Sequence, residues 1–208
     1  GGALPVMTQH LVSRIGQRGD GIVETADGVR HVSKVLSGET VELAGTRLLR
    51  VLSPSPDRVE PFCAHYATCG GCKFQHWQEE AYRSWKLELV RQALAVQGLA
   101  AEVQPLQDAH GTGRRRVSLH VRQIDGVWRA GFMEQKSHDL APLDQCPVLV
   151  APLQNAPVLA AEFGSLLGAC DVALTAAANG IDVAIKAERK ATERRMSALS
   201  ALFNTRNL

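Results

Sequence analysis

One stretch of the sequence decides how the rest is organised, and it runs Cys63-Ala64-His65-Tyr66-Ala67-Thr68-Cys69-Gly70-Gly71-Cys72. Three thiols within ten residues can wrap around one inorganic centre, and Cys146 lies 74 positions after Cys72 as a candidate fourth ligand. Gly70 and Gly71 lack a Cβ atom, so the backbone can turn tightly there and direct N–H groups at sulfur. Pro147 follows the last cysteine, as proline does in bacterial cluster-binding runs. The sequence therefore predicts a metal centre held by Cys63, Cys69, Cys72 and Cys146.

The spacing of these cysteines bears on the identity of the metal. Structural zinc sites usually pair two short knuckles of the C-x₂₋₄-C type. This chain has one such knuckle, one cysteine six positions upstream of it, and one distant cysteine. The pattern favours a [4Fe–4S] cluster, while a zinc site and unliganded thiols stay open as alternatives. The fifth cysteine, Cys170, is expected to be an ordinary buried thiol.

The composition is ordinary for a globular protein and excludes several classes. Of 208 residues, 45% are apolar and 21% are charged, as in soluble domains. The sequence contains no run of about 18 apolar residues, the length that a membrane-spanning helix needs, so no membrane span is predicted. Gly1 to Pro5 lack the basic and apolar regions of a secretory signal, so we expect a cytoplasmic protein whose five cysteines form no disulfide framework. The net charge of +2 is too small to indicate nucleic-acid binding by itself.

The segment before the cysteine loop predicts a small β-barrel. Short apolar-polar alternations are broken by Gly and Asp, and about five strands of this size with turns between them are typical of a barrel. The strand candidates are Leu11-Val12, residues 19–23, 29–32, 40–43 and 48–52. Two closely spaced prolines, Pro54 and Pro56, cannot continue a strand ladder. The first domain is therefore expected to occupy residues 1–56.

The remainder, residues 57–208, predicts a second domain that mixes helices with β-hairpins, so the fold class is α+β. Helices are expected over residues 77–97 with Gly98 as the stop, over 148–167 with breaks near Pro152 and Pro157, and over about 192–202. In the first hairpin Val117, Leu119 and Val121 alternate and Asp125-Gly126 offers a type I′ turn. The second hairpin joins residues 172–175 to 181–185 through Asn179-Gly180.

Basic side chains beside glycine-rich turns and beside the cysteine loop can meet a phosphate backbone without recognising any base. The candidate RNA contacts are Arg14, Arg18, Lys34, Lys73, Phe74, Arg114, Arg115 and Arg116. For each basic residue taken separately, a solvated surface is the alternative.

Some of these candidates have more specific alternatives. Lys73 could instead offset the charge of a cluster. Phe74 could stack on an unpaired base, as in single-stranded RNA recognition, or cover the cluster as a dry lid. Because alternate residues of a strand face opposite ways, one of the three arginines 114–116 could form an internal ion pair. His76 could cap the helix that follows it.

Four local matches make the chain similar to the bacterial 23S ribosomal RNA (uracil-5-)-methyltransferases that carry a TRAM domain and an iron–sulfur cluster. Residues 19–23, Gly-Asp-Gly-Ile-Val, and 37–41, Ser-Gly-Glu-Thr-Val, resemble the G-x-G-hydrophobic and P-G-E-x-V signatures of the TRAM domain. Residues 55–63 look like the bridge into the cluster loop. Cys63, Cys69, Cys72 and Cys146 match the cluster ligands, and the segments 114–117 and 131–147 follow the central domain's hairpin. The resemblance extends from Thr8 over nearly the whole chain.

This resemblance implies a division of labour. The TRAM barrel and the central domain would bind RNA, expected to be 23S ribosomal RNA, and the cluster would have no redox role. S-adenosylmethionine and the catalytic groups would belong to a Rossmann-like domain. No glycine-rich adenosylmethionine loop is found up to Leu208, so the chain is expected to be the non-catalytic portion of the enzyme. The TRAM-like part also departs from the pattern, because Ser37 stands where the family often has proline and the connection at residues 44–46 is short.

Two rival functions are compatible with the same residues. One is a free-standing RNA-binding module with a structural Cys₄ zinc site and no enzymatic parent. The other is an electron carrier with one cluster, which would need no contact with RNA.

Overall fold

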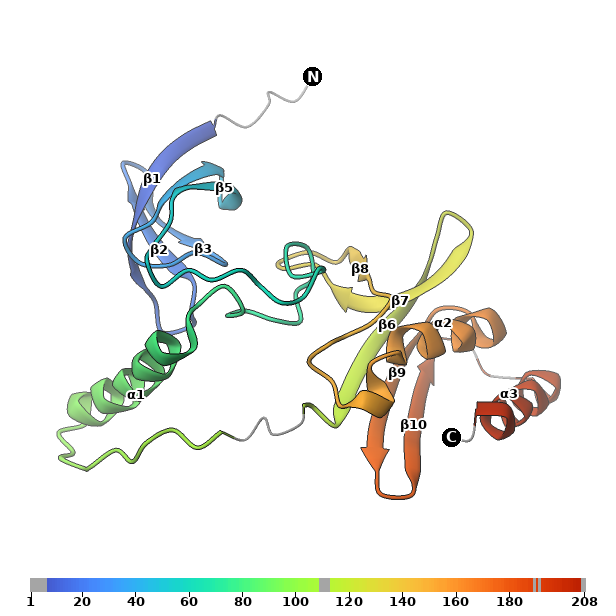
Figure 1. The fold of residues 1–208 in the computed structure, drawn as a ribbon. Helices are drawn as coiled ribbons and strands as arrows, with labels where there is room; N and C mark the ends of the chain where they lie inside the picture. Colours follow the sequence, from blue (N-terminus) through green and yellow to red (C-terminus); the bar gives the residue numbers. More distant parts are fainter. Residues whose placement is uncertain (1–6, 109–112, 189, 191, 207–208) are drawn as a thin grey trace. The chain divides into compact units, whose positions relative to one another are not determined.

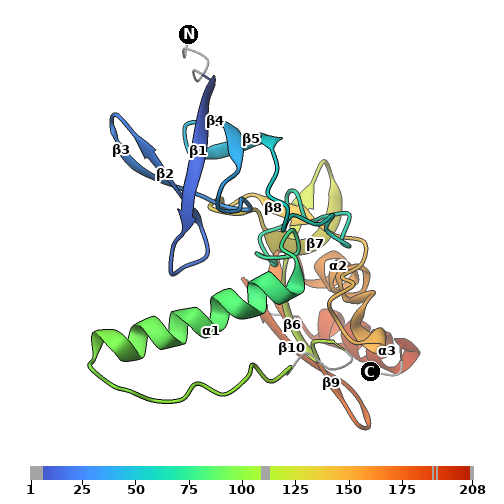
Figure 2. The same cartoon turned by 60° about the vertical axis from the view of Figure 1, so that its left-hand side comes forward.

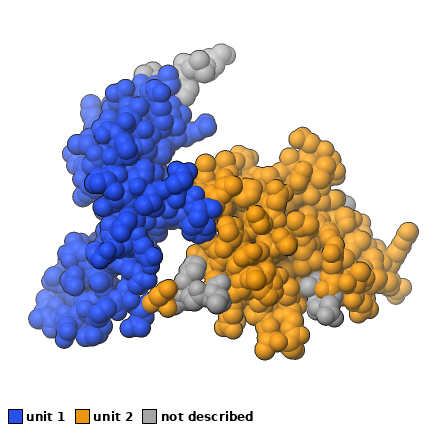
Figure 3. All heavy atoms as spheres, in the orientation of Figure 1, with its two compact units in different colours: residues 1–62, 72–107 blue, residues 63–71, 108–208 orange. Residues whose placement is uncertain are grey.

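A computed structural model describes residues 7–108, 113–188, 190 and 192–206. The chain divides into two compact units, coloured in Figure 3, and each is built from two separate stretches of sequence. Unit 1 comprises residues 1–62 and 72–107, and unit 2 comprises residues 63–71 and 108–208. The boundary at residue 56 that the sequence suggests stays a prediction. In the part of the chain that the structure covers, no helix is long and apolar enough to cross a membrane.

Unit 1 begins with the five strands that the alternation predicts. They form one antiparallel sheet of order β3-β2-β1-β4-β5 (Figure 1). The strands are β1 (Met7–Ile15), β2 (Gly21–Thr25), β3 (Gly28–Val32), β4 (Thr40–Ala44) and β5 (Arg47–Ser53). Register shifts in β1 and along the β4–β5 pair mark β-bulges, which bend and twist a sheet.

This sheet curls around one apolar core without closing into a barrel. Val32 of the edge strand β3 and Val51 of the opposite edge strand β5 both pack on the cluster that contains Val12 and Val41. Among the described residues β3 and β5 are not hydrogen-bonded to each other, so the expected barrel is corrected to an open, curled sheet. The connection between β3 and β4 explains the difference, because its residue Val35 is buried in the core and takes up space there.

The long helix α1 (Glu79–Val96) follows a short antiparallel contact within unit 1. The Val59 N–H donates to the His76 carbonyl at 3.0 Å, and the Gln78 N–H donates to the Asp57 carbonyl at 2.8 Å. The helix is capped by Gln78, whose side chain accepts from the Ala81 N–H, so the cap suggested for His76 is wrong. Gly98 has φ 67° and its N–H donates to the Ala95 carbonyl, which confirms the predicted glycine stop.

Unit 2 contains a second five-stranded antiparallel sheet, of order β10-β9-β6-β7-β8. Its strands are β6 (Arg116–Ile124), β7 (Val127–Met133), β8 (Leu140–Pro142), β9 (Cys170–Ala177) and β10 (Gly180–Ala187). Both predicted hairpins are confirmed. Asp125 and Gly126 have φ 49° and 80°, as a type I′ turn requires. The other turn lies one residue earlier than expected, because Gly180 already belongs to β10.

One face of this sheet is covered by helix. The predicted interruption of the apolar segment is confirmed, since proline breaks it into the single turn η1 (Ala151–Leu153) and the helix α2 (Ala156–Leu167). Helix α2 packs against β6, β7 and β9, as Figure 2 shows, and buries Phe163 and Leu167 there. The last helix, α3 (Glu193–Arg206), packs on α2 and extends four residues beyond its predicted end. The sheet and α2 therefore form a two-layer core.

Candidate functional site

The loop that carries the first cysteines is held in a compact turn. The Tyr66 N–H donates to the Cys63 carbonyl at 3.0 Å, and the Cys69 N–H donates to the His65 carbonyl at 2.9 Å. The Gly71 N–H donates to Cys69 Sγ at 3.3 Å. Backbone N–H groups that point at sulfur favour the thiolate form, which is the form that binds metal. The loop thus presents the Cys69 sulfur in a setting suited to a ligand.

The two glycines of the loop are required by close contacts with β7. The Gly70 N–H donates to the Met133 carbonyl at 3.0 Å. A Cβ on Gly70 would lie 2.5 Å from that same carbonyl oxygen, and a Cβ on Gly71 would lie 2.9 Å from the Phe132 ring. These distances are shorter than real Cβ contacts, so glycine is needed for packing as well as for turning. The sequence had indicated a tight turn, and the structure adds the β7 contact.

The fourth predicted ligand, Cys146, lies near the same part of unit 2. Cys69 packs with Ala141 and Leu143, and Leu143 precedes Cys146 by three residues. The Cys146 N–H donates to the Gln154 carbonyl at 2.9 Å, which fixes the loop, and both Cys69 and Cys146 are buried. Cys72 belongs to unit 1. It follows Cys69 by only three residues, so the backbone between them keeps the two Cα atoms within about 11 Å of each other.

The thiols are nevertheless not gathered into a finished metal site. Among the described residues no group of three or more His, Cys, Asp or Glu side chains has the arrangement that would hold a metal ion. The donor chemistry suits a thiolate-bound cluster, and the Gly71–Cys69 hydrogen bond agrees with it. The metal centre as a whole stays a prediction.

Cys170 differs from the other four cysteines, as expected. It begins β9 and its side chain is buried in the core of unit 2. Burial, and then the neighbouring Asp171 carboxylate, raise the pKa of the Cys170 thiol to about 11. Because the thiolate is the metal ligand, Cys170 is poorly suited to bind metal and serves as a natural control.

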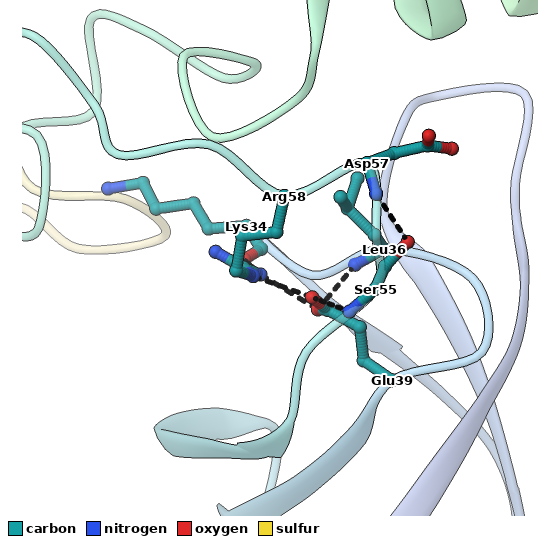
Figure 4. Close-up of polar contacts among 6 residues, drawn as sticks. All are labelled: Lys34, Leu36, Glu39, Ser55, Asp57 and Arg58. Atoms are coloured by element: carbon teal, nitrogen blue, oxygen red, sulfur yellow. Dashed lines mark hydrogen bonds and ion pairs between the residues drawn. The ribbon is translucent and has the colours of Figure 1, made fainter.

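A buried ion pair that sequence reasoning missed stands between the sheet of unit 1 and the segment that leads to the cysteines. Figure 4 shows the Glu39 carboxylate receiving four hydrogen bonds. Arg58 donates two of them, Nε to Oε1 at 2.5 Å and Nη2 to Oε2 at 2.7 Å. The backbone N–H groups of Leu36 and Ser55 donate the others, at 2.8 and 3.1 Å. Glu39 therefore joins the β3–β4 connection to residues 55–58.

The charge of Glu39 is maintained in spite of its burial. Burial by itself raises the pKa of a carboxyl group. The hydrogen bonds from Arg58 and from the two backbone N–H groups outweigh it, so the pKa of Glu39 lies below its usual value. The available sequence signal was one acidic residue between Gly38 and a buried strand, within a segment already matched to a TRAM signature.

His76 lies in the same part of unit 1 and is kept neutral. Its side chain is 1% exposed. Burial, and then the positive charge of Arg58, lower the pKa of His76 to about 4. Together with the backbone contact to Val59, this places His76 in the packed junction before α1 and not at an exposed surface.

Lys73 and Phe74 make internal contacts within unit 1. Lys73 Nζ lies 3.2 Å from Asp20 and donates to the Arg18 carbonyl. The Phe74 ring centre lies 5.1 Å from that of Tyr82 and 5.4 Å from that of Trp85. A Cβ on Gly19 would lie 2.3 Å from the Phe74 ring. These contacts give both residues a packing role, and their contact with RNA stays a prediction.

The other basic candidates differ in exposure. Arg114, Arg115 and Arg116 are all exposed, and within the described residues none of their guanidinium groups has a hydrogen bond or ion pair. Their backbone is fixed, since Arg114 exchanges hydrogen bonds with Val148 and Val150, at 2.9 and 3.0 Å. The suggested internal ion pair is therefore not formed there.

Besides Lys73, three basic candidates lie in unit 1. Arg14 and Arg18 are exposed, in β1 and in the turn after it. Lys34 is half-buried, and Figure 4 shows its side chain extending away from the Glu39 carboxylate.

Comparison with known proteins identifies the relatives of this chain. No family model matches it. An uncharacterized RNA methyltransferase of Caulobacter vibrioides is 40% identical over 208 residues, which cover 94% of this chain and 49% of the relative. An uncharacterized RNA methyltransferase of Brucella suis is 36% identical over 202 residues, which cover 93% of this chain and 49% of the relative. The chain is homologous to RNA methyltransferases.

One further relative has a more specific name. The 23S rRNA (uracil(1939)-C(5))-methyltransferase RlmD of Halomonas elongata is 36% identical over 158 residues, which cover 70% of this chain and 33% of the relative. The chain spans about half the length of the first curated relatives. The resemblance to RNA methyltransferases that the sequence suggested is thereby confirmed at this level.

Proposed function

We propose that this chain is the RNA-binding and cluster-binding portion of an S-adenosylmethionine-dependent 23S rRNA (uracil-5-)-methyltransferase. The observation that carries the proposal is its homology to RNA methyltransferases, including one named for uracil 1939 of 23S rRNA. Methyl transfer and S-adenosylmethionine binding are assigned to the part of those enzymes that this chain does not span, and no catalytic residue is assigned here. The role left to this chain is to bind and position RNA.

In this proposal Cys63, Cys69, Cys72 and Cys146 hold a [4Fe–4S] cluster. Support comes from the spacing of the cysteines, from the Gly71 N–H directed at Cys69 Sγ, and from the burial of Cys69 and Cys146. The bound cluster supplies a structural cross-link between the loop and the distant cysteine, with no redox step. The chain's own contacts prepare this loop, since Gly70 bonds to β7 and the Cys146 loop bonds to Gln154.

The proposed RNA contacts fall into three groups. Arg114, Arg115 and Arg116 are the strongest candidates, because their exposed guanidinium groups sit on a fixed backbone. Arg14, Arg18 and Lys34 would contribute phosphate contacts from unit 1. Lys73 and Phe74 are kept as weaker members, since their side chains already pack within unit 1.

A salt series tests the RNA proposal. The wild-type chain should bind a 23S rRNA fragment containing the region of uracil 1939, with an affinity that falls steeply as salt rises, because each phosphate contact releases counterions. Replacing Arg114, Arg115 and Arg116 by glutamine should lower the affinity roughly tenfold or more at 0.1 M salt and flatten the salt dependence. A matched triple variant of α1, Arg83→Gln with Lys86→Gln and Arg91→Gln, should change neither.

Two results would contradict the proposal. One is absence of RNA binding by the wild type, and the other is binding that salt does not weaken. Equal binding by the triple arginine variant would remove residues 114–116 from the interface.

A further inference from the structure

The sheet of unit 2 has a second face, opposite α2, and Arg116 is the one proposed RNA contact that lies on it. In an antiparallel sheet, residues paired across strands point to the same face, and neighbours along a strand point to opposite faces. Val117, Leu119 and Val121 of β6 are buried, and their partners Leu174, Val172 and Cys170 on β9 are buried with them. This set faces α2. The alternate residues of each strand therefore face the other way.

The pairings β6–β7, β6–β9 and β9–β10 contain no register shift, so they give the residues of this second face. A row here means the residues that lie opposite one another across neighbouring strands. One row consists of Arg116, Thr175 and Asp182. The next consists of three small side chains, Ser118, Ala173 and Ala184. A third contains Gly131, His120, Asp171 and Lys186, and beyond it Arg122 lies opposite Arg129. The apolar pair Ile124 and Val127 ends this face beside the turn. A row of small side chains is thus bordered on both sides by rows with charge.

The charges on this face do not cancel one another. Arg116, Arg122, Arg129 and Lys186 stand against Asp171 and Asp182, a net of +2 with histidine neutral. Asp171 is already engaged, since it lies 2.8 Å from His120 Nδ1 and 3.5 Å from Arg122 Nη2. Arg116, Arg129 and Lys186 are exposed, and no other described residue forms a hydrogen bond or ion pair with their side chains.

We propose that this face is an RNA-binding surface that contacts the ribose–phosphate backbone of one strand. The inference rests on the proposed function and adds a location to it. Charge complementarity supports this, because exposed arginine and lysine side chains that no described residue binds match phosphate. The small row, Ser118, Ala173 and Ala184, lets a chain approach the sheet closely between the charged rows. Arg116 belongs both to this face and to the 114–116 run, so the two surfaces are continuous.

The same composition excludes base stacking on this face as the main source of affinity. Sheets that bind single-stranded RNA through bases carry aromatic side chains for stacking. None of the paired residues assigned to this face is aromatic, and Trp128 of β7 lies on the other side, where a Cβ on Gly164 of α2 would touch it. We therefore expect binding at this face to depend strongly on salt and little on base sequence.

A charge-removal variant tests the surface. The double variant Arg129→Gln with Lys186→Gln should bind the same 23S rRNA fragment roughly tenfold more weakly at 0.1 M salt. The slope of log affinity against log salt should fall by roughly 1.4, at about 0.7 per phosphate contact. The control, Arg194→Gln with Arg195→Gln on α3, removes the same charge from the other side of unit 2 and should match the wild type. Far-UV circular dichroism and urea midpoints confirm that both variants fold.

A second pair of variants adds charge to the small row without removing any contact. Ala184 is exposed in the middle of β10. Ala184→Glu should weaken binding at least fivefold relative to Ala184→Lys, because the two changes add similar bulk but opposite charge. If Arg129→Gln/Lys186→Gln and Ala184→Glu both bind like the wild type while wild-type binding is salt-dependent, this surface is wrong and the proposed function stands. If the wild type itself does not bind RNA, the proposed function fails, and this surface fails with it.

Discussion

The two sheets of this molecule have the same number of strands and the same antiparallel pairing, but they bury their apolar residues differently. In unit 1 the sheet curls so that both edge strands reach one core. In unit 2 a helix covers one face, and the β6–β9 rows on the opposite face are polar or small. The curled sheet uses its buried charge, Glu39, as an internal link, whereas the layered sheet leaves Arg116, Arg129 and Lys186 exposed. Internal charge in unit 1 should therefore matter for stability, and surface charge in unit 2 for binding.

The largest expected effect comes from breaking the internal link. Glu39→Ala should lower the free energy of unfolding by about 3–5 kcal/mol, because it leaves the Arg58 guanidinium partly buried without its carboxylate. Urea unfolding followed by tryptophan fluorescence measures this change. The matched control is Glu42→Gln, which removes a pair whose Arg50 side chain is 66% exposed and should cost less than about 1 kcal/mol. Equal losses in the two variants would mean that Glu39 is not a structural link.

The next effect is a pH dependence that originates in unit 1. The folded pKa of His76, about 4, lies below its usual 6.5, so between these values the unfolded chain binds more protons than the folded one. Stability is then fully present above pH 6.5 and is lost as the pH falls toward 4, by on the order of 3 kcal/mol in total. Urea midpoints at pH 7, 6 and 5 should decrease. This pH range lies above the range in which Glu39 acts. Because the pKa of Glu39 is lowered in the folded protein, its stabilising effect is lost only as the pH falls below about 4.5.

Two histidine variants separate this effect from general acid sensitivity. His76→Gln should have nearly constant stability from pH 7 to 5, although it is less stable overall. His138→Gln, which changes an exposed histidine of unit 2, should retain the wild-type slope. A wild-type slope in His76→Gln would assign the proton uptake to another group.

A smaller effect is expected from the contact between the cysteine loop and β7. Gly70→Ala places a Cβ 2.5 Å from the Met133 carbonyl oxygen, so the loop must shift, at a cost of about 1–3 kcal/mol. Ala64→Ser changes an exposed residue of the same loop and should stay within about 0.5 kcal/mol. Thermal unfolding of both variants beside the wild type measures the difference. If Gly70→Ala unfolds like Ala64→Ser, the close approach to β7 is not a constraint.

Local patterns predicted the elements of both units well. Alternation located all ten strands except β8, Gly98 ended α1, and two prolines divided the apolar segment before β9. Each of these signals acts over a few residues. The open sheet of unit 1 was not predicted, because closure depends on whether β3 pairs with β5, and no local sequence pattern determines that.

The candidate site was predictable only in part. The metal centre that spacing assigns to Cys63, Cys69, Cys72 and Cys146 stays a prediction, and the burial expected for Cys170 is confirmed. The bond between Glu39 and Arg58 spans 19 positions, and nothing in the local sequence pairs an acid after Gly38 with an arginine beyond two prolines. The positions of Lys73 and Phe74 beside the loop suggest RNA contact, and tertiary contacts with Asp20 and Tyr82 give them a packing role as well.

The cluster assigned to the four thiols is the central proposal for this protein, and one measurement tests it directly. Iron, zinc and acid-labile sulfide are determined in the chain after purification without oxygen. We predict about four iron and four sulfide per chain, with loss of both in Cys69→Ala and in Cys146→Ala and full retention in Cys170→Ala. One zinc per chain without sulfide, or a cluster that survives in Cys69→Ala and Cys146→Ala, would contradict the assignment.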